Sequence, residues 1–274
     1  MLVIVRLAAI FAAMKQPIIG LCALIASTFT SLCGSPQGAD RIVKEQRLAE
    51  LEWKQSLLAA QTISEKKAVF EVRPNNAEYG ARMVSEIGPS LQESWTMPFI
   101  LWLLNHHPDL SNQGLKHLIE FVDQFHMDST MLGEFCVALA PRGNFGATSG
   151  DIQTSMALKQ QKAKFIDKVL KSGSSPAIRG QAALAKSALL AQLGDSPEIN
   201  KRRFDLLRKA IIGAADSMVG EVTLADIAKE EIYRMTKLSK GATAPNLKGM
   251  DSRGQPLQLS DMKGKIVVLI FWRS

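Results

Sequence analysis

The sequence has little cysteine and no Cys-X-X-Cys pair. Its three cysteines are Cys22, Cys33 and Cys136. The first two lie within or at the edge of an apolar N-terminal segment, so a processed chain would keep Cys136 alone. A redox or metal-binding thiol and a buried core thiol are the two interpretations of Cys136. Its apolar neighbours Phe135 and Val137 favour a buried cysteine that behaves as a small hydrophobic side chain.

Positive charge is not concentrated in any part of the sequence, although the formal net charge is +7. Residues 1–39 contribute +2 and residues 241–274 contribute +3, whereas residues 40–240 carry 26 basic and 24 acidic side chains. A nucleic-acid-binding surface would gather lysine and arginine on one stripe or one helix. The even distribution of charge therefore excludes nucleic acid as an expected partner.

The sequence has few histidines, and their spacing is poor for metal binding. The four are His106, His107, His117 and His126. No two of them are four residues apart on one helix, and no Cys-X-X-Cys accompanies them, so a tetrahedral metal site is not expected. His106 and His107 precede Pro108, a pattern that predicts the end of a helix, where a histidine suits the helix dipole. We therefore expect no metal.

A glycine-rich stretch lacks the features of a phosphate-binding loop. Residues 143–150, GNFGATSG, contain no lysine and follow no predicted strand. A phosphate loop needs both, because its lysine and its backbone N–H groups hold the phosphates between a strand and a helix. We expect a plain loop at this place, and no nucleotide or other cofactor in the chain.

The first 39 residues are expected to be a targeting segment rather than part of the fold. Met14 and Lys15 begin a short basic region, residues 17–30 are apolar, and residues 31–35 supply small side chains where a signal peptidase could cut. We therefore predict an extracytoplasmic protein, periplasmic or membrane-anchored, whose membrane contact is limited to this segment. Disulfide chemistry is meaningful in such a compartment.

A second apolar run, residues 1–13, leaves the start of the protein open. Either translation begins at Met14, or the two runs together form a longer membrane anchor. We favour Met14, because Pro17 interrupts the pair and makes it a poor single span. A lipoprotein signal is disfavoured, since Leu32 ahead of Cys33 is not a small residue.

Residues 40–240 lack convincing strand alternation and instead carry start and stop signals for helices. The start signals are Asn76, Pro98, Ser111, Ser129, Ser175-Pro176, Ser196-Pro197 and Thr223 with Asp226, and the stop signals are Pro74, Gly88-Pro89, Pro141, Gly194 and Gly241. Thr223 and Asp226 have the spacing of a capping box. Pro98 is compatible with either the start of a helix or a kink within one.

The first of these helices is expected over residues 41–70. Leu48, Leu51 and Leu58 recur at helical spacing among many charged side chains, with Trp53 beside them. This arrangement predicts an apolar stripe along a charged helix that runs unbroken to the Arg-Pro stop.

Short helices with short connections predict a mainly α protein, with an irregular helical array or bundle over residues 40–240. Tetratricopeptide-like packing stays open, although the sequence shows no clean repeat of about 34 residues. The acidic pairs Asp123/Asp128 and Glu230/Glu231 are interpreted as solvated faces or caps. An apolar groove for a partner peptide is plausible in any such array.

Residues 241–274 form a further region with a different pattern. Gly241 and Pro245 end the preceding helix, since glycine suits a helix C-terminus and proline disfavours the helical conformation of the residue before it. Residues 246–260 predict a β-hairpin, in which Gly254 occupies a polar turn and supplies a positive φ.

A second turn and an apolar run follow this hairpin. Residues 261–265 form the turn, and residues 266–272 are seven consecutive apolar side chains rich in β-branched and aromatic types. A run this short and this apolar predicts a strand buried on both faces, as in the middle of a parallel sheet.

The ordered pattern GATAP, GQPLQLSD and KGKIVVLIFWRS resembles the opening of a thioredoxin-fold domain of the redoxin/TlpA-like thiol:disulfide oxidoreductase family. The resemblance covers residues 241–274 and is specific in the order of its parts. The residues that carry it are Gly241, Pro245, Gly254, Leu259, Asp261, Gly264, Lys265, Phe271 and Trp272. A helical region ahead of a redoxin domain also resembles the arrangement of some exported bacterial proteins.

The resemblance implies a function whose catalytic residues lie outside this sequence. In the family, a strand that ends in Phe-Trp is followed by Trp-Cys-X-X-Cys at the start of a helix, where the cysteine pKa is lowered and disulfide exchange takes place. We expect these cysteines and the remainder of a truncated domain beyond Ser274. The complete protein would then be an extracytoplasmic oxidoreductase acting on protein thiols and disulfides, with a helical domain that binds a partner. The 274-residue chain itself is expected to be inactive.

Two other functions stay open. A noncatalytic helical interaction module with a degenerate redoxin stub would carry the same residues. A peroxiredoxin-type antioxidant protein opens in a similar way, but such proteins usually carry Phe-Tyr-Pro at this strand end and Thr-X-X-Cys downstream. Phe271 and Trp272 therefore favour the oxidoreductase branch of the resemblance.

Overall fold

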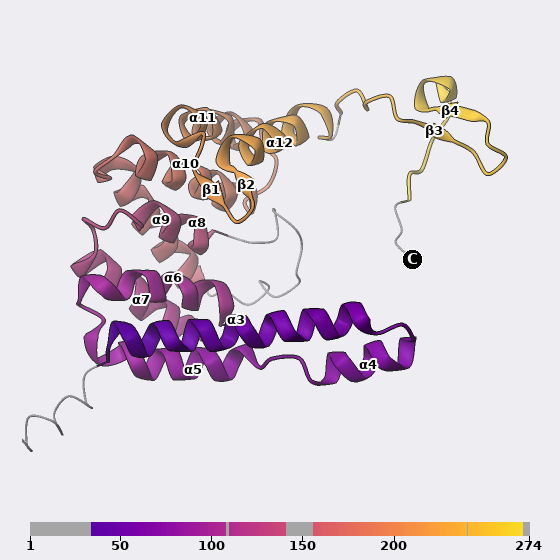
Figure 1. Cartoon of the computed structure of the whole chain (residues 1–274). Helices are drawn as coiled ribbons and strands as arrows, with labels where there is room; N and C mark the ends of the chain where they lie inside the picture. The colour runs from indigo at the N-terminus through magenta and orange to yellow at the C-terminus, as the bar shows by residue number, and fades with distance from the viewer. Residues whose placement is uncertain (1–33, 108–109, 141–155, 240, 271–274) are drawn as a thin grey trace, which may run out of the picture. The chain divides into compact units, whose positions relative to one another are not determined.

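A computed structural model of the chain describes residues 34–107, 110–140, 156–239 and 241–270 (Figure 1). Helices dominate the described residues, and the strands form two small antiparallel sheets of two strands each. The predicted mainly α fold is thus confirmed. The chain divides into two compact units, with the boundary after His126, and each is described separately below. Residues 1–33 of the predicted targeting segment and the GNFGATSG loop lie outside the described residues. The end predicted for the targeting segment, at residue 39, is wrong, because residues 36–39 form the first turn of helix α3 (Pro36–Ala59) and Ala39 is buried.

Helices make up the regular structure of the described residues of the first unit. They are α3 (Pro36–Ala59), α4 (Ile63–Glu71), α5 (Asn76–Ile87), α6 (Met97–His106) and α7 (Asn112–Phe125), with short 3-10 turns η1 (Gly88–Ser90) and η2 (Ser94–Thr96). Helix α5 packs against both α3 and α6, so Met83 and Ile87 are buried in the core of this unit. Pro98 opens α6 rather than kinking it. The predicted cap Ser111 accepts a hydrogen bond from the Gly114 N–H.

The single helix predicted over residues 41–70 is wrong, because the chain breaks it into α3 and α4. Thr62 starts α4 with a capping box: its hydroxyl accepts from the Glu65 N–H, and the Glu65 carboxylate accepts from the Thr62 N–H. These reciprocal bonds satisfy N–H groups that a new helix leaves unpaired. The cap of α5 is also displaced by one residue, to Asn75 from the predicted Asn76.

The leucine stripe predicted for this helix does not face the core. Beyond the first turn of α3, the buried side chains are those of Ile42 and Gln46. Leu48, Leu51 and Leu58 are exposed instead. The leucines do lie along one side of a helix, as their spacing predicts, but no described part of the first unit covers them.

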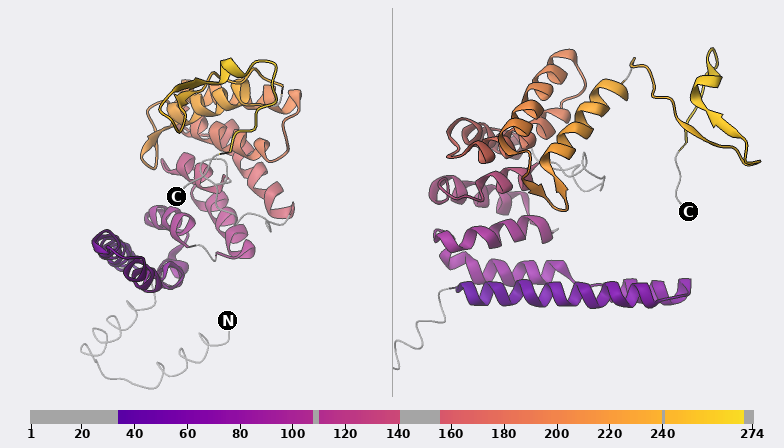
Figure 2. Two further views of the ribbon diagram at one scale, coloured as in Figure 1. Left: turned by 90° about the vertical axis from the view of Figure 1, so that its right-hand side faces the viewer. Right: turned by 45° about the horizontal axis from the view of Figure 1, so that its top comes forward.

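The second unit consists of α8 (Leu132–Leu139), α9 (Met156–Ser172), α10 (Pro176–Ala191), α11 (Pro197–Ala214) and α12 (Leu224–Lys237). Helix α10 is central and lies beside α8, α9 and α11, while α12 packs on α11 (Figure 2). The predicted caps Ser175, Ser196 and Thr223 each accept a backbone N–H at the start of their helices. The helix starts are unevenly spaced, so the array is irregular.

A small hairpin joins α11 to α12. Its strands β1 (Met218–Val219) and β2 (Val222–Thr223) pair antiparallel around Gly220, which has a φ of +66°. Among the described helices of both units, none combines the length and the apolar character needed to cross a membrane.

The C-terminal region contains the predicted hairpin. Strands β3 (Lys248–Met250) and β4 (Pro256–Gln258) pair antiparallel, with Gly249 opposite Leu257, and the 3-10 turn η5 (Leu259–Met262) follows. The turn contains Gly254 with a φ of +78°, as its position predicts.

The strand predicted over residues 266–272 is absent from its described part. Residues 266–270 adopt no regular secondary structure, and their side chains are exposed. The physical reason is that a strand needs a neighbour for its N–H and C=O groups, and no described segment pairs with this one.

Candidate functional site

Cys136 is the one cysteine within the described residues, and it is a buried thiol. It lies in α8 with no exposed surface, next to Phe135, whose ring contacts Phe165 of α9 edge to face. Burial raises the pKa of the Cys136 thiol far above its ordinary value, because the apolar surroundings disfavour the thiolate. Only the thiolate attacks a disulfide, so Cys136 cannot perform exchange in the folded protein. The structure confirms the predicted core cysteine.

Two of the described histidines at helix ends, His106 and His126, make local polar contacts. His106 ends α6 as predicted, and its Nδ1 lies 2.9 Å from the Trp102 carbonyl while its ring stacks on the indole. His126 follows α7 and is buried, with its Nε2 2.7 Å from the Leu91 carbonyl oxygen. Within the described residues, no group of three or more His, Cys, Asp or Glu side chains is arranged to hold a metal ion.

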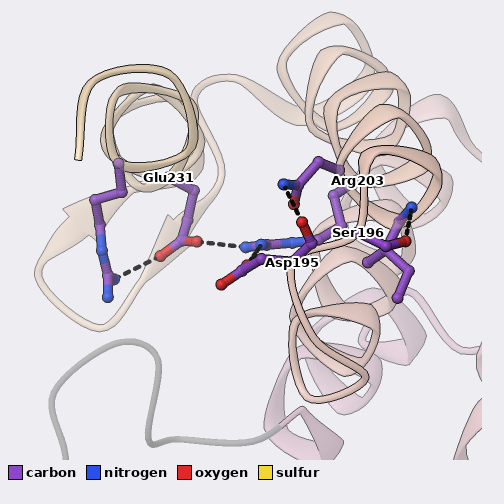
Figure 3. A network of polar contacts seen from close by, with 7 residues as sticks. Asp195, Ser196, Arg203 and Glu231 are labelled. Carbon is purple, nitrogen blue, oxygen red and sulfur yellow. Dashed lines mark hydrogen bonds and ion pairs between the residues drawn. The ribbon is translucent and has the colours of Figure 1, made fainter. Parts of the chain in front are cut away.

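A buried ion pair connects α11 to α12, and the sequence interpretation missed it. The Arg203 guanidinium donates to the Glu231 carboxylate over 2.8 Å, and the two side chains keep only 6% and 9% of their exposure. Glu231 also accepts from Arg234 over 2.8 Å, and Asp195 lies 3.9 Å from Arg203 (Figure 3). The interpretation of Glu231 as a solvated face is therefore wrong, although its neighbour Glu230 is exposed.

Two polar atoms beside this ion pair are buried without a protein partner. They are Nε of Arg203 and Oδ1 of Asn200. The Asn200 amide nitrogen donates to the Asp195 carbonyl over 3.2 Å, which ties the loop before α11 to that helix. Ser196, which Figure 3 also labels, uses its hydroxyl to cap α11, where it accepts from the Ile199 N–H. We therefore assign this network the role of fixing α12 against α11.

Most of the residues that carry the redoxin resemblance lie in the C-terminal hairpin, in the turn after it, or in the segment that leads into it. Gly241 and Gly264 have positive φ values of +85° and +80°, which glycine adopts without strain. The Leu259 N–H donates to the Leu247 carbonyl, closing the hairpin, and the Lys265 N–H donates to the Met262 carbonyl in the second turn.

A side-chain hydrogen bond supports the turn that follows the hairpin. Asp261 accepts a hydrogen bond from the Gln258 amide over 3.0 Å. Pro245 is half-buried at the start of the segment. Phe271 and Trp272, which end the apolar run, lie outside the described residues.

The described part of the apolar run is an uncovered surface. Ile266, Val268 and Ile270 expose 99%, 77% and 78% of their area, and Val267 and Leu269 are also exposed. Consecutive large apolar side chains in this state are unusual in a soluble protein, because burying each one is favourable. The segment is therefore suited to pairing with further strands.

Comparison with known proteins assigns neither a family nor a function to the chain. No family model matches the chain, and no curated protein and no solved structure matches it significantly.

Proposed function

We propose that this chain belongs to an extracytoplasmic thiol:disulfide oxidoreductase of the redoxin/TlpA-like type. The helices over residues 34–239 serve to bind a protein partner, and residues 241–274 open the redox domain. Protein thiols and disulfides are the substrates of the complete protein. Its chemistry would come from one low-pKa cysteine that attacks a substrate disulfide and a second cysteine that resolves the mixed disulfide.

One observation supports the proposal: the segment that resembles a redoxin opening contains the predicted hairpin and a second turn after it. Gly254 and Gly264 adopt positive φ at the two turns, and β3 and β4 pair on either side of the first. The apolar residues 266–270 come next and are uncovered, which fits a strand whose sheet neighbours would lie elsewhere.

A second candidate is a helical protein-interaction module without redox activity. This candidate needs no reactive cysteine, and Cys136, the one described cysteine, is buried. The exposed leucines of α3 favour it as well, since they offer an apolar surface to another protein.

Reading the transcript beyond the codon for Ser274 separates these functions. The oxidoreductase predicts a Cys-X-X-Cys within about five codons, at the start of a helix-forming stretch. An in-frame stop directly after Ser274 would contradict the oxidoreductase and leave the interaction module. A Thr-X-X-Cys in place of Cys-X-X-Cys would instead indicate a peroxiredoxin.

An activity assay completes the test. The chain with the additional sequence should reduce insulin disulfides in the presence of dithiothreitol, and a variant with its first motif cysteine changed to serine should not. The 274-residue chain is the matched control, and we expect it to be inactive. Equal activity of the two forms would contradict the proposal.

A further inference from the structure

Helix α3 presents an uncovered apolar seam with the spacing of a coiled coil. Leu48, Leu51, Gln55 and Leu58 are separated by three, four and three residues, which is the a/d spacing of a heptad. The three leucines expose 58%, 52% and 87% of their area, and Gln55 is exposed too. This surface, residues 48–58 of α3, is called the leucine seam below.

The leucine seam lies on the opposite side of α3 from its packed face. Gln46 and Trp53 occupy position f of the same heptads, about 160° around the helix from Leu48 and Leu51 respectively. Gln46 donates to the Asn76 side chain of α5, and the Trp53 indole donates to the Val69 carbonyl of α4 over 2.8 Å. Helices α4 and α5, which Figure 1 shows running alongside α3, therefore do not cover the seam, whose leucines are exposed.

Charged side chains flank the leucine seam with opposite signs on its two sides. Position e holds Glu45 and Glu52, and position g holds Arg47 and Lys54. In a parallel coiled coil, a residue at g meets the residue five positions later, at e, on the partner helix. Arg47 of one chain would then meet Glu52 of the other, and the same pair forms again by symmetry. Glu45 already pairs with Arg82 of α5 within the chain.

An antiparallel arrangement would bring like charges together. It pairs e with e and g with g, so with the leucines in contact Glu52 would face Glu52, and Lys54 would face Lys54. The charge pattern thus favours a parallel orientation. It also favours a second copy of this chain as the partner, because that copy places a glutamate opposite Arg47 and an arginine opposite Glu52.

We propose that the leucine seam of α3 is a self-association surface, on which two copies of this chain pair as a short parallel coiled coil held by Leu48, Leu51 and Leu58. The Arg47–Glu52 pairs between the chains set the register. The seam is only about two heptads long, so the association is weak and concentration-dependent. It does not depend on the redox proposal, because α3 and residues 241–270 belong to different units.

Sedimentation velocity of the full chain measures the monomer–dimer equilibrium over a series of concentrations. The series should reach about 0.5 mM, because dimers with dissociation constants near 1 mM are then still detectable. The unchanged chain should shift from monomer to dimer, and Leu51→Lys should weaken dimerisation at least about tenfold. Ile212→Lys is the matched control, since Ile212 is equally apolar, helical and 84% exposed but lies in α11. Circular dichroism verifies that both variants keep their helix content. A chain that stays monomeric, or a dimer that Leu51→Lys leaves intact, would overturn the proposal.

Charge reversal tests the parallel register. Arg47→Glu and Glu52→Arg should each weaken dimerisation, because each places like charges at both e/g contacts. An equimolar mixture of the two single variants should form a mixed dimer, and the double variant should dimerise like the unchanged chain. Stronger dimers from either single variant, or no recovery in the mixture and the double variant, would refute the parallel pairing.

Discussion

Gly180 of α10 and Gly213 of α11 lie face to face, so that a Cβ built on Gly213 would come within 3.3 Å of the Gly180 Cα. A Cβ on Gly180 would lie 2.7 Å from the Ala214 Cβ and 2.9 Å from the Ala214 backbone nitrogen. Atoms at these distances overlap, so the two helices pack closely only because glycine occupies this crossing.

Gly180→Ala should therefore destabilise the second unit by about 1–3 kcal/mol, even though alanine favours a helix over glycine. The backbone atoms of Ala214 cannot move aside as a flexible side chain could. Urea unfolding followed by circular dichroism measures the change. Gly249→Ala is the control, because a Cβ there meets no atom within 4 Å. Equal effects of the two substitutions would show that the crossing is not tight.

The buried Arg203–Glu231 pair leads to a second prediction. Glu231→Gln removes the negative charge that balances Arg203, whose other described carboxylate neighbour, Asp195, is 3.9 Å away. Breaking a buried ion pair in this way costs about 3–5 kcal/mol, because the remaining charge stays desolvated. Glu230→Gln is the matched control on the exposed side of the same helix. A surface ion pair contributes less than about 1 kcal/mol to the free energy of unfolding. A loss that small for Glu231→Gln would contradict the role of this pair in holding α12 against α11.

The helix starts of this fold could be predicted from sequence because a cap is local chemistry. Ser111, Ser175, Ser196 and Thr223 each bond to an N–H three residues ahead, and the spacing is visible in the sequence. Thr62 uses the same chemistry with Glu65. Its signal is masked in the sequence by the leucine spacing of the preceding residues, which favours one continuous helix.

The ion pair and the seam could not be predicted because they depend on tertiary packing. Arg203 and Glu231 are 28 residues apart, and their burial follows from the contact of α11 with α12. A leucine stripe predicts an apolar face, but it does not tell whether a neighbour covers that face. For Leu48 and Leu51 of α3, the packed face is formed by other residues.

The burial of Cys136 predicts that the thiol reacts only after unfolding. Ellman's reagent at pH 8 should titrate the same number of thiols in the folded chain and in folded Cys136→Ala. In guanidinium chloride the unchanged chain should show one thiol more. Rapid modification of Cys136 in the folded state would contradict its burial.

The same thiol gives stability a pH dependence. Burial raises the pKa of Cys136 in the folded state, whereas the unfolded thiol ionises near its ordinary pKa of about 8.5. Stability is therefore unaffected below that pH and falls as the pH rises above it, because only the unfolded state releases the proton. Urea unfolding between about pH 7.5 and 10 should show a steeper loss for the unchanged chain than for Cys136→Ala. Parallel losses would contradict this.

The capping box of Thr62 predicts local rather than global instability. Thr62→Ala removes the side chain that accepts from the Glu65 N–H, and α4 has no buried residue to compensate. Amide exchange in α4 should accelerate about fivefold, a change equivalent to the loss of a typical cap, while α5 is unchanged. Ser56→Ala is the control, because the Ser56 hydroxyl donates to the Glu52 carbonyl within α3 and caps no helix start. Unchanged exchange in α4 would show that the box contributes nothing.

The exposed run at residues 266–270 gives the last prediction. Burying its five large side chains in a sheet would contribute on the order of 10 kcal/mol, comparable with the whole stability of an ordinary domain. In the 274-residue chain nothing described covers or pairs with it, so its amides should exchange within seconds, like those of a free peptide. The amides of α7 at Leu118, Ile119 and Val122, which are buried, should exchange far more slowly.

Hydrogen exchange must be measured on a verified monomer, because an uncovered apolar strand can also be protected by pairing with another chain. If the amides of Val267 to Ile270 in that monomer were protected as strongly as those of α7, the run would be part of a folded sheet, and the proposal that its neighbours come from further sequence would lose its support.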